Sequence, residues 1–162
     1  MLVMIWVKRW KEKRSGMIMT EPIPFIEFYT DGASRGKYGS SYSFVCIKNG
    51  EVVDMVSEQL PIGVTSGEAE YIAIEEAVKY AVDNGVSNAM INTDSESIVE
   101  QMYGRAKVKS KQVKNHHKNI KELINGRNIQ FNHAGRNNVY IGLTDGLCDR
   151  EVGSRKRSYR KG

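Results

Sequence analysis

Four acidic residues lie where an apolar segment should end or a helix should begin: Asp31, Glu70, Asp94 and Asp145. Carboxylates brought together on one edge of a fold repel one another and raise each other's pKa. A divalent cation removes that conflict, and oxygen-only ligands suit Mg²⁺ or Mn²⁺, which also bind phosphate oxygens. Two such ions about 3.5–4 Å apart can activate water and stabilise the leaving oxygen of a phosphodiester. The four acids therefore predict a metal site that acts on a nucleic-acid backbone.

Each acid has a simpler explanation when it is taken alone. An aspartate after a strand is often a turn residue, and Asp94 could cap the helix that follows it. Glu70 could be a surface residue, because it has three acidic neighbours in the same expected helix, Glu68, Glu75 and Glu76. The joint placement of four acids on separate elements is what favours the metal site.

Hydrophobic periodicity predicts the elements that must position these acids. Alternation with period two indicates strands, and a period near 3.6 indicates helices. Asn49-Gly50 is the dipeptide preferred in a tight type I′ hairpin turn, and Thr65 with Glu68 matches a helix capping box. We expect strands over residues 25–30, 41–48, 51–58, 89–93 and 128–133, and helices over 65–84, 95–103, 113–124 and 141–152.

The order of these elements predicts an α/β fold with one mixed five-stranded sheet. Three consecutive strands form an antiparallel meander, and helices then connect the fourth and fifth strands as parallel neighbours through right-handed crossovers. The fourth strand should lie beside the first, with helices on both faces of the sheet. Asp31 and Asp94 would then emerge at the same edge, where open sheets bind ligands, and Glu70 and Asp145 would lean over it.

The bulk composition fits a single globular domain that contacts a polyanion. The chain has 162 residues, of which 40% are hydrophobic and 27% charged, and its formal net charge is +5. This length suffices for one core. Basic residues cluster over 8–14, 105–114 and 155–161, around an acidic centre. This distribution favours nucleic acid as the partner.

Three segments are expected along the chain: a flexible basic extension over residues 1–24, a catalytic domain over 25–152 and a basic tail over 153–162. No apolar run approaches the roughly 20 residues needed to cross a bilayer. The basic residues follow the apolar start, which is the reverse of a secretory signal. Cys46 and Cys148 lie in apolar segments without ligand spacing, so we expect reduced thiols in a cytoplasmic protein.

Short motifs occur in order along the chain, and each contains one of the four acids. They are Tyr29-Thr30-Asp31-Gly32-Ala33, residues 65–71, Asn92-Thr93-Asp94-Ser95, and residues 133–136 followed by 144–147. Together they resemble the motifs of the type 1 ribonuclease H family, over residues 25–152. The resemblance implies a metal-dependent endonuclease that cleaves the RNA strand of RNA–DNA hybrids and leaves 3′-hydroxyl and 5′-phosphate ends.

The resemblance also implies a role for each acid. Asp31 would bridge two magnesium ions, for which manganese could substitute. Glu70 and Asp94 would complete the site on the side of the leaving group. Asp145 would complete the site that holds the attacking water. His133 would be a further catalytic residue, which assists turnover and product release.

Substrate contacts implied by the same resemblance surround these acids. Gly32 and Ser34 would lie near the RNA strand, whose 2′-hydroxyls distinguish RNA from DNA. Thr65 would contact a phosphate of the DNA strand, and Arg136 would contact a phosphate from its own loop. Residues 105–114 are too few for the extra basic helix with which some members hold substrate, so their lysines would replace it in part. We expect a monomer with no obligatory protein partner.

Two other functions could be carried by the same fold. A non-catalytic module that binds RNA–DNA hybrids would be expected to lose one or more acids, and all four are present. Proofreading-type exonucleases carry an Asp-x-Glu pair on the first strand. This chain instead has Glu27 before Asp31 and Ala33 after it. The sequence therefore favours the ribonuclease. Primer removal, R-loop clearance and service to a virus or mobile element would all use the same site.

Overall fold

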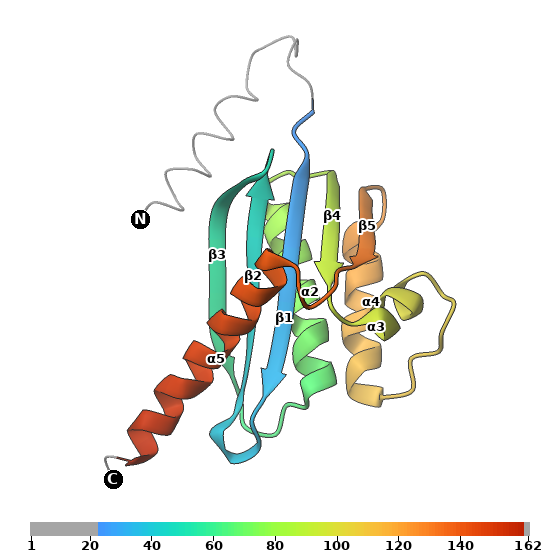
Figure 1. The fold of residues 1–162 in the computed structure, drawn as a ribbon. Helices are drawn as coiled ribbons and strands as arrows, with labels where there is room; N and C mark the ends of the chain where they lie inside the picture. The colour runs from blue at the N-terminus through green and yellow to red at the C-terminus, as the bar shows by residue number, and fades with distance from the viewer. Residues whose placement is uncertain (1–22, 161–162) are drawn as a thin grey trace.

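The computed structural model describes residues 23–160, with side chains through residue 153 (Figure 1). The basic extension expected over residues 1–24 lies almost wholly outside the described residues. The strands are β1 (Ile26–Ser34), β2 (Ser40–Lys48), β3 (Glu51–Leu60), β4 (Asn88–Thr93) and β5 (Asn128–His133). The helices are the short 3₁₀ helix η1 (Gly36–Tyr38), α2 (Ser66–Asp83), α3 (Glu96–Met102), α4 (Lys111–Ile124) and α5 (Val139–Arg160).

One five-stranded sheet forms the middle layer, with the strand order β3-β2-β1-β4-β5. Helices α2 and α4 lie on one face of the sheet, and α5 crosses the other face over β1, β2 and β3 (Figure 1). Within residues 23–160, no helix is both long and apolar enough to cross a bilayer. The layers therefore match the expected sheet with helices on both faces.

Strand pairing confirms the predicted topology. β1 pairs antiparallel with β2 and parallel with β4, where Phe28 lies beside Ile91. β4 in turn pairs parallel with β5. The β2–β3 connection turns at Asn49 and Gly50, whose φ angles of 50° and 82° fit the type I′ hairpin. The fold class expected from the sequence is confirmed.

One boundary of β1 differs from the prediction, and the difference concerns Asp31. We expected the strand to end at Thr30, but it runs to Ser34. β2 is long enough to pair with it throughout, so Asp31 lies opposite Ser43 in the antiparallel ladder. The parallel ladder to β4 stops earlier, at the pair of Thr30 and Thr93. Asp31 therefore lies inside a strand, just past the end of the β4 ladder, rather than at the start of a loop.

Helix α5 is longer than expected at both ends. The prediction was residues 141–152, whereas the helix spans Val139–Arg160. The side chain of Asn138 caps its start, because Oδ1 accepts from the backbone N–H groups of Tyr140 at 2.9 Å and Ile141 at 3.3 Å. The residues after 152 are rich in arginine and lysine, which favour helix. The expected start of a separate basic tail therefore falls within this helix.

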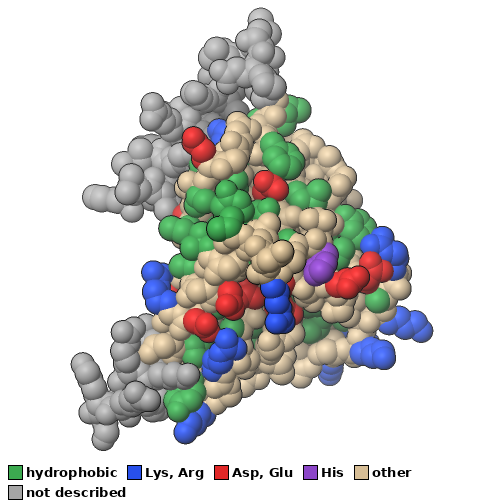
Figure 2. Space-filling view, viewed as in Figure 1, with side chains coloured by type: hydrophobic (Ala, Val, Ile, Leu, Met, Phe, Trp, Pro, Cys, Tyr) green, Lys and Arg blue, Asp and Glu red, His purple; other side chains and the backbone are tan. Residues whose placement is uncertain are grey.

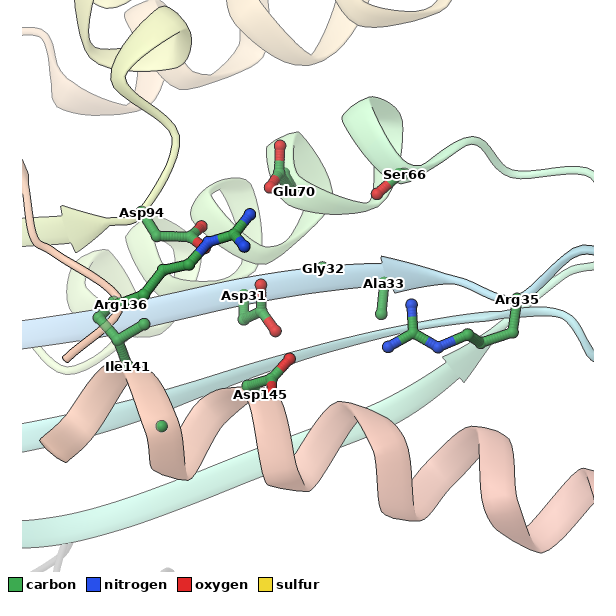
Figure 3. A pocket seen from close by; sticks show the side chains of 11 residues that line it. Asp31, Gly32, Ala33, Arg35, Ser66, Glu70, Asp94, Arg136, Ile141 and Asp145 are labelled. Carbon is green, nitrogen blue, oxygen red and sulfur yellow. The ribbon is translucent and has the colours of Figure 1, made fainter. Parts of the chain in front are cut away.

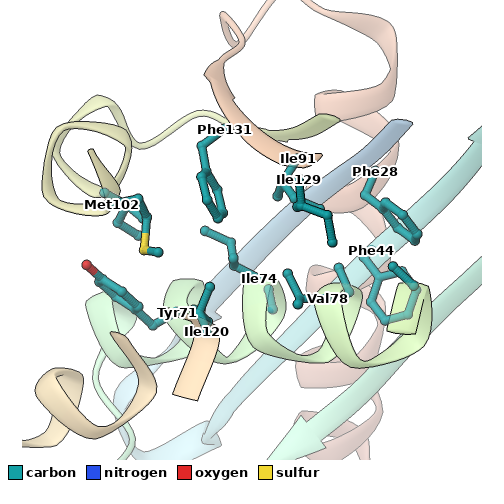
Figure 4. Packing of buried hydrophobic residues seen from close by; sticks show 14 of the residues in the cluster. Phe28, Phe44, Tyr71, Ile74, Val78, Ile91, Met102, Ile120, Ile129 and Phe131 are labelled. Atoms are coloured by element: carbon teal, nitrogen blue, oxygen red, sulfur yellow. The ribbon is translucent and has the colours of Figure 1, made fainter. Parts of the chain in front are cut away.

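Two apolar cores, one on each face of the sheet, hold the layers together. The larger core joins α2 and α4 to the sheet (Figure 4). Phe28 and Phe44 meet edge to face in it, with ring centroids 6.0 Å apart. The smaller core lies under α5 and consists of Tyr29, Val45, Ile47, Ala134, Ile141 and Leu147. Because β1 is covered on both faces, Asp31 projects from a rigid strand.

The adjacent histidines of α4, His116 and His117, both contact neighbouring helices. His116 lies between α4 and α2, with Nδ1 2.5 Å from Glu75 Oε2 and Nε2 3.4 Å from Glu68 Oε1. His117 Nε2 lies 3.1 Å from the backbone oxygen of Gln101. The apolar face of α4 packs on α2, and this packing turns both rings inward. The two histidines therefore link α4 to α2 and to α3.

The two cysteines are free and buried, as expected from their apolar surroundings. Burial raises the pKa of Cys46 and of Cys148 to about 12. Thiols with such a pKa remain protonated and poorly reactive at neutral pH.

Candidate metal centre

The four acids singled out in the sequence converge on one cavity of about 360 Å³ (Figure 3). One carboxylate oxygen each from Asp31, Glu70 and Asp94 lies within 4.8 Å of the others. Asp145 lines the same cavity from α5. Figure 3 shows Asp31 between Glu70 and Asp94 on one side and Asp145 on the other. The structure thus brings together acids that are far apart in the chain.

The approach of α2 to β1 depends on the glycine that follows Asp31. A Cβ atom at Gly32 would lie 2.2 Å from the carbonyl carbon of Ala69 and 2.2 Å from the backbone nitrogen of Glu70. No side chain fits at such distances, so the first turns of α2 rest directly on the backbone of β1. This contact brings Glu70 next to Asp31. Gly32, expected to lie near the RNA strand, therefore also has a packing role.

Two buried serines of β2 hold α5, and hence Asp145, against the sheet. Ser43 Oγ donates to the backbone oxygen of Thr144 at 2.7 Å. Ser41 Oγ makes the same kind of bond one turn later in α5, at 2.9 Å. Both serines are fully buried. Ser43 also lies opposite Asp31 in the β1–β2 ladder. Its hydroxyl therefore helps to fix the position of Asp145 relative to Asp31.

Asparagine side chains hold the end of β4, from which Asp94 projects. Asn92 Nδ2 donates to the backbone oxygen of Phe28 at 3.2 Å. Asn132 Nδ2 donates to Asn92 Oδ1 at 2.9 Å. These bonds tie β4 to both of its neighbours, so Asp94 leaves the sheet in a fixed direction.

Burial and mutual repulsion make the ionised acids unfavourable in the absence of a cation. Burial, followed by the charges of Asp94 and Asp145, raises the pKa of Asp31 to about 7. Burial, followed by the charges of Asp94 and Asp31, raises the pKa of Glu70 to about 7, although Arg136 opposes the rise. A divalent cation would remove this conflict. The donors, all carboxylate oxygens, are those that hard cations prefer.

Two arginines lie beside the acids. Arg136 Nε is 3.8 Å from Asp94 Oδ2, and the side chain is 93% exposed. Arg35 also lines the cavity, and its Nη2 is 2.8 Å from Asp149 Oδ1. Figure 2 shows acidic side chains gathered in the middle of this face with basic side chains around them. Arg35 was not among the site residues predicted from the sequence, although a cation four residues after Asp31 was a usable signal.

The remaining expected site residues have other contacts. Thr65 caps α2, because its hydroxyl accepts from the backbone N–H of Glu68 at 3.2 Å. Ser34 is the last residue of β1. His133 is the exposed last residue of β5, paired with Thr93. Neither Ser34 nor His133 is among the residues that line the cavity. The roles of these residues in substrate binding and turnover stay predictions.

A family model described as reverse transcriptase-like matches residues 29–141. The chain belongs to this family. Its fold is that of ribonuclease H, as the solved structures below show. The resemblance drawn from the short motifs is thereby confirmed, and it supports a nuclease with a nucleic-acid partner.

Several solved ribonuclease H structures are similar to this chain. The N-terminal ribonuclease H domain of a Mycobacterium tuberculosis protein gives a TM-score of 0.74 at 24% identity, over 85% of this chain and 99% of that one. Ribonuclease H1 of Halobacterium salinarum gives 0.73 at 23%, over 80% and 98%. LC11 ribonuclease H1, isolated from compost and solved with an RNA/DNA hybrid, gives 0.70 at 28%, over 80% and 97%. No curated protein matches the chain in sequence.

Proposed function

We propose that this protein is an endoribonuclease that hydrolyses the RNA strand of RNA–DNA hybrids. It would use two divalent ions, Mg²⁺ or Mn²⁺, and leave 3′-hydroxyl and 5′-phosphate ends. The observation that carries the proposal is the convergence of Asp31, Glu70 and Asp94 within 4.8 Å, with Asp145 lining the same cavity. The hybrid bound to LC11 ribonuclease H1, which is 28% identical to this chain, supports the substrate.

The acids divide into two groups around Asp31. Asp31 lies between the others (Figure 3), so its carboxylate would contribute to both cation sites. Glu70 and Asp94 would complete one site, and Asp145 would complete the other. When bound, such ions lower the pKa of water and stabilise the leaving oxygen of a phosphodiester. The protein contributes the fixed positions of these carboxylates.

The protonation of two acids should set the pH dependence of the reaction. The pKa values of Asp31 and Glu70 are each raised to about 7, and both side chains bind cations only when ionised. At low cation concentration, activity should therefore rise between pH 6 and pH 8. Higher cation concentrations should move this rise to lower pH, because cation binding and proton binding compete.

Contacts outside the acids would select the hybrid. Gly32 and Ser34, at the end of β1, would face the RNA strand and its 2′-hydroxyls. The Thr65 hydroxyl accepts a bond from the backbone of α2, and its own proton can still be donated to a DNA-strand phosphate. Arg136 is exposed beside Asp94 and would bind another phosphate. His133 would assist product release from the end of β5.

The same proposal includes the extent of the catalytic unit, its oligomeric state and its cellular location. The catalytic unit would comprise residues 25–152, act as a monomer and need no protein partner. Free buried thiols are consistent with a reducing cytoplasm. Basic residues outside this unit, over 8–14 and 155–161, would add affinity for any phosphate backbone.

A panel of labelled substrates tests the proposal. Purified protein is incubated with an RNA–DNA hybrid, duplex RNA, duplex DNA and single-stranded RNA, with Mg²⁺ or with EDTA. Cleavage of RNA in the hybrid alone, dependent on Mg²⁺, is the expected result. Binding of the hybrid without cleavage would indicate the non-catalytic module instead. Equal cleavage of duplex DNA and hybrid would indicate a general nuclease.

A further inference from the structure

A second arginine lines the cavity at the end opposite Arg136. Arg35 is the first residue after β1, and its guanidinium points back along the cavity toward Asp145 (Figure 3). Arg35 and Arg136 are the only cationic residues that line the cavity in the described part of the chain. The acids therefore lie between two arginines.

A tight turn fixes the backbone of Arg35. Its N–H donates to the backbone oxygen of Gly39 at 2.9 Å, and its carbonyl accepts from the N–H of Tyr38 at 3.2 Å. The φ angles of Gly36 and Gly39 are 55° and 89°, in the region that favours glycine. Arg35 thus extends from a closed turn rather than from an open loop.

An ion pair fixes the other end of the side chain. Arg35 Nη2 is 2.8 Å from Asp149 Oδ1, and the two side chains are 43% and 52% exposed. Exposed pairs of this kind add little stability, so stability alone does not account for the arrangement. Asp149 lies one helical turn, about 6 Å, after Asp145 in α5. The pair therefore holds a guanidinium close to the acid that would complete the second cation site.

We propose that Arg35 binds a phosphate of the RNA strand within about two nucleotides of the one that is cut, and that Asp149 orients the guanidinium before substrate arrives. The inference rests on the proposed function. A guanidinium has five N–H donors that suit phosphate oxygens. Its described contacts are with Asp149 and with the backbone oxygen of Ser34 at 3.4 Å. Nucleotides rise about 3.4 Å along a strand, and Asp149 lies about 6 Å along α5 from Asp145. A phosphate held beside Asp149 would therefore lie within roughly two nucleotides of the cut.

Binding measurements on the full chain test the contact separately from cleavage. Fluorescence anisotropy with a labelled RNA–DNA hybrid in EDTA gives the affinity at several salt concentrations. Arg35→Ala should weaken binding about tenfold and lower the slope of log K against log salt by about 0.9. Arg35→Lys keeps the charge but not the planar fork, so its affinity should lie between those of the wild type and Arg35→Ala.

Arg127→Ala is the matched control, because it removes one exposed positive charge far from the cavity. Arg127 precedes β5, and its Nη1 is 2.9 Å from the backbone oxygen of Leu123. The N-terminal ends of β4 and β5 lie at the sheet edge away from the acids (Figure 1). Equal losses from Arg35→Ala and Arg127→Ala would overturn the proposal, since only overall charge would then matter.

Hybrids that carry one neutral methylphosphonate locate the contact. A methylphosphonate that weakens binding by the wild type but not by Arg35→Ala marks the phosphate that Arg35 binds. That phosphate should lie in the RNA strand within about two nucleotides of the cut. Its location in the DNA strand would overturn the proposal. A wild type that neither binds nor cuts hybrids would overturn the proposed function itself, whereas normal cutting with no effect at Arg35 would overturn this inference alone.

Discussion

Replacing Asp31 with asparagine should stabilise the cation-free fold while lowering turnover. Burial, with the charges of Asp94 and Asp145, raises the pKa of Asp31 from 3.8 to about 7. Each unit corresponds to about 1.4 kcal/mol, so roughly three units set an upper limit of about 4 kcal/mol on the penalty at pH 8. The acids share this repulsion, and the new amide accepts a weaker hydrogen bond. We therefore expect Asp31→Asn to raise the free energy of unfolding by about 1–2 kcal/mol at pH 8 in EDTA.

The pH dependence has a definite sign, because the folded pKa of Asp31 lies above the unfolded value. Below about pH 4 the carboxyl is protonated in both states, and there is no penalty. Between about pH 4 and pH 7 the folded state binds the proton more tightly, so the stability of the wild type falls as the pH rises. The gap between Asp31→Asn and the wild type should therefore widen from pH 5 to pH 8.

Thermal unfolding in EDTA at pH 5, 6, 7 and 8 measures this gap. For a chain of this size, each kcal/mol corresponds to roughly 3 °C. Millimolar Mg²⁺ should then stabilise the wild type and reduce the advantage of the variant. Glu122→Gln, at an exposed carboxylate of α4, is the control and should show no such pattern. If Asp31→Asn is no more stable at pH 8, or if the gap is the same at pH 5, the account of repulsion is wrong.

Three further substitutions test other parts of the structure. Gly32→Ala should lower the free energy of unfolding by about 1–3 kcal/mol and weaken cation binding, because its Cβ would lie 2.2 Å from the Glu70 nitrogen. Unchanged urea unfolding and cation titration would contradict the packing role. Glu75→Ala should cost about 1–3 kcal/mol at pH 7, because it removes the partner of His116. Burial raises the pKa of Glu75, but hydrogen bonds with His116 and other groups lower it overall, so this loss should shrink as the pH falls through the lowered pKa; urea unfolding at acidic and neutral pH shows whether it does. Ser43→Ala should raise the Mg²⁺ concentration for half-maximal cleavage more than the KM for hybrid, and the opposite split in a kinetic titration would argue against its role.

The sequence predicted the topology because local signals agreed with it. Asn49 and Gly50 take the positive φ angles of the hairpin that they indicate, and the crossover rule placed the fourth strand beside the first. Asp31 and Asp94 therefore met at the expected edge. The end of β1 was not predictable, because its last residues are paired only with β2 and carry little apolar patterning of their own.

The parts of the site that the sequence did not predict depend on contacts between distant elements. Nothing local marks Ser43 as a donor to the backbone of α5, since serine at that position also suits an exposed strand. Arg35 reaches the cavity only because the turn after β1 closes and Asp149 meets it from α5. Nothing local marks the contact of His116 either, because its acidic partner Glu75 lies on another helix. Such pairings become visible only when the packing is known.

If this carboxylate cluster performs the proposed cleavage, two neighbouring acids should differ sharply in their effect on the reaction. Asp94 lines the cavity, whereas Glu96, two residues later at the start of α3, is exposed and does not. Single-turnover cleavage of an RNA–DNA hybrid is measured for both variants in excess Mg²⁺. Asp94→Asn should lower the rate about 10²–10³-fold, and Glu96→Gln should change it by less than about twofold. Equal rates for the wild type and Asp94→Asn, or equal losses in the two variants, would contradict the assignment of the reaction to this site.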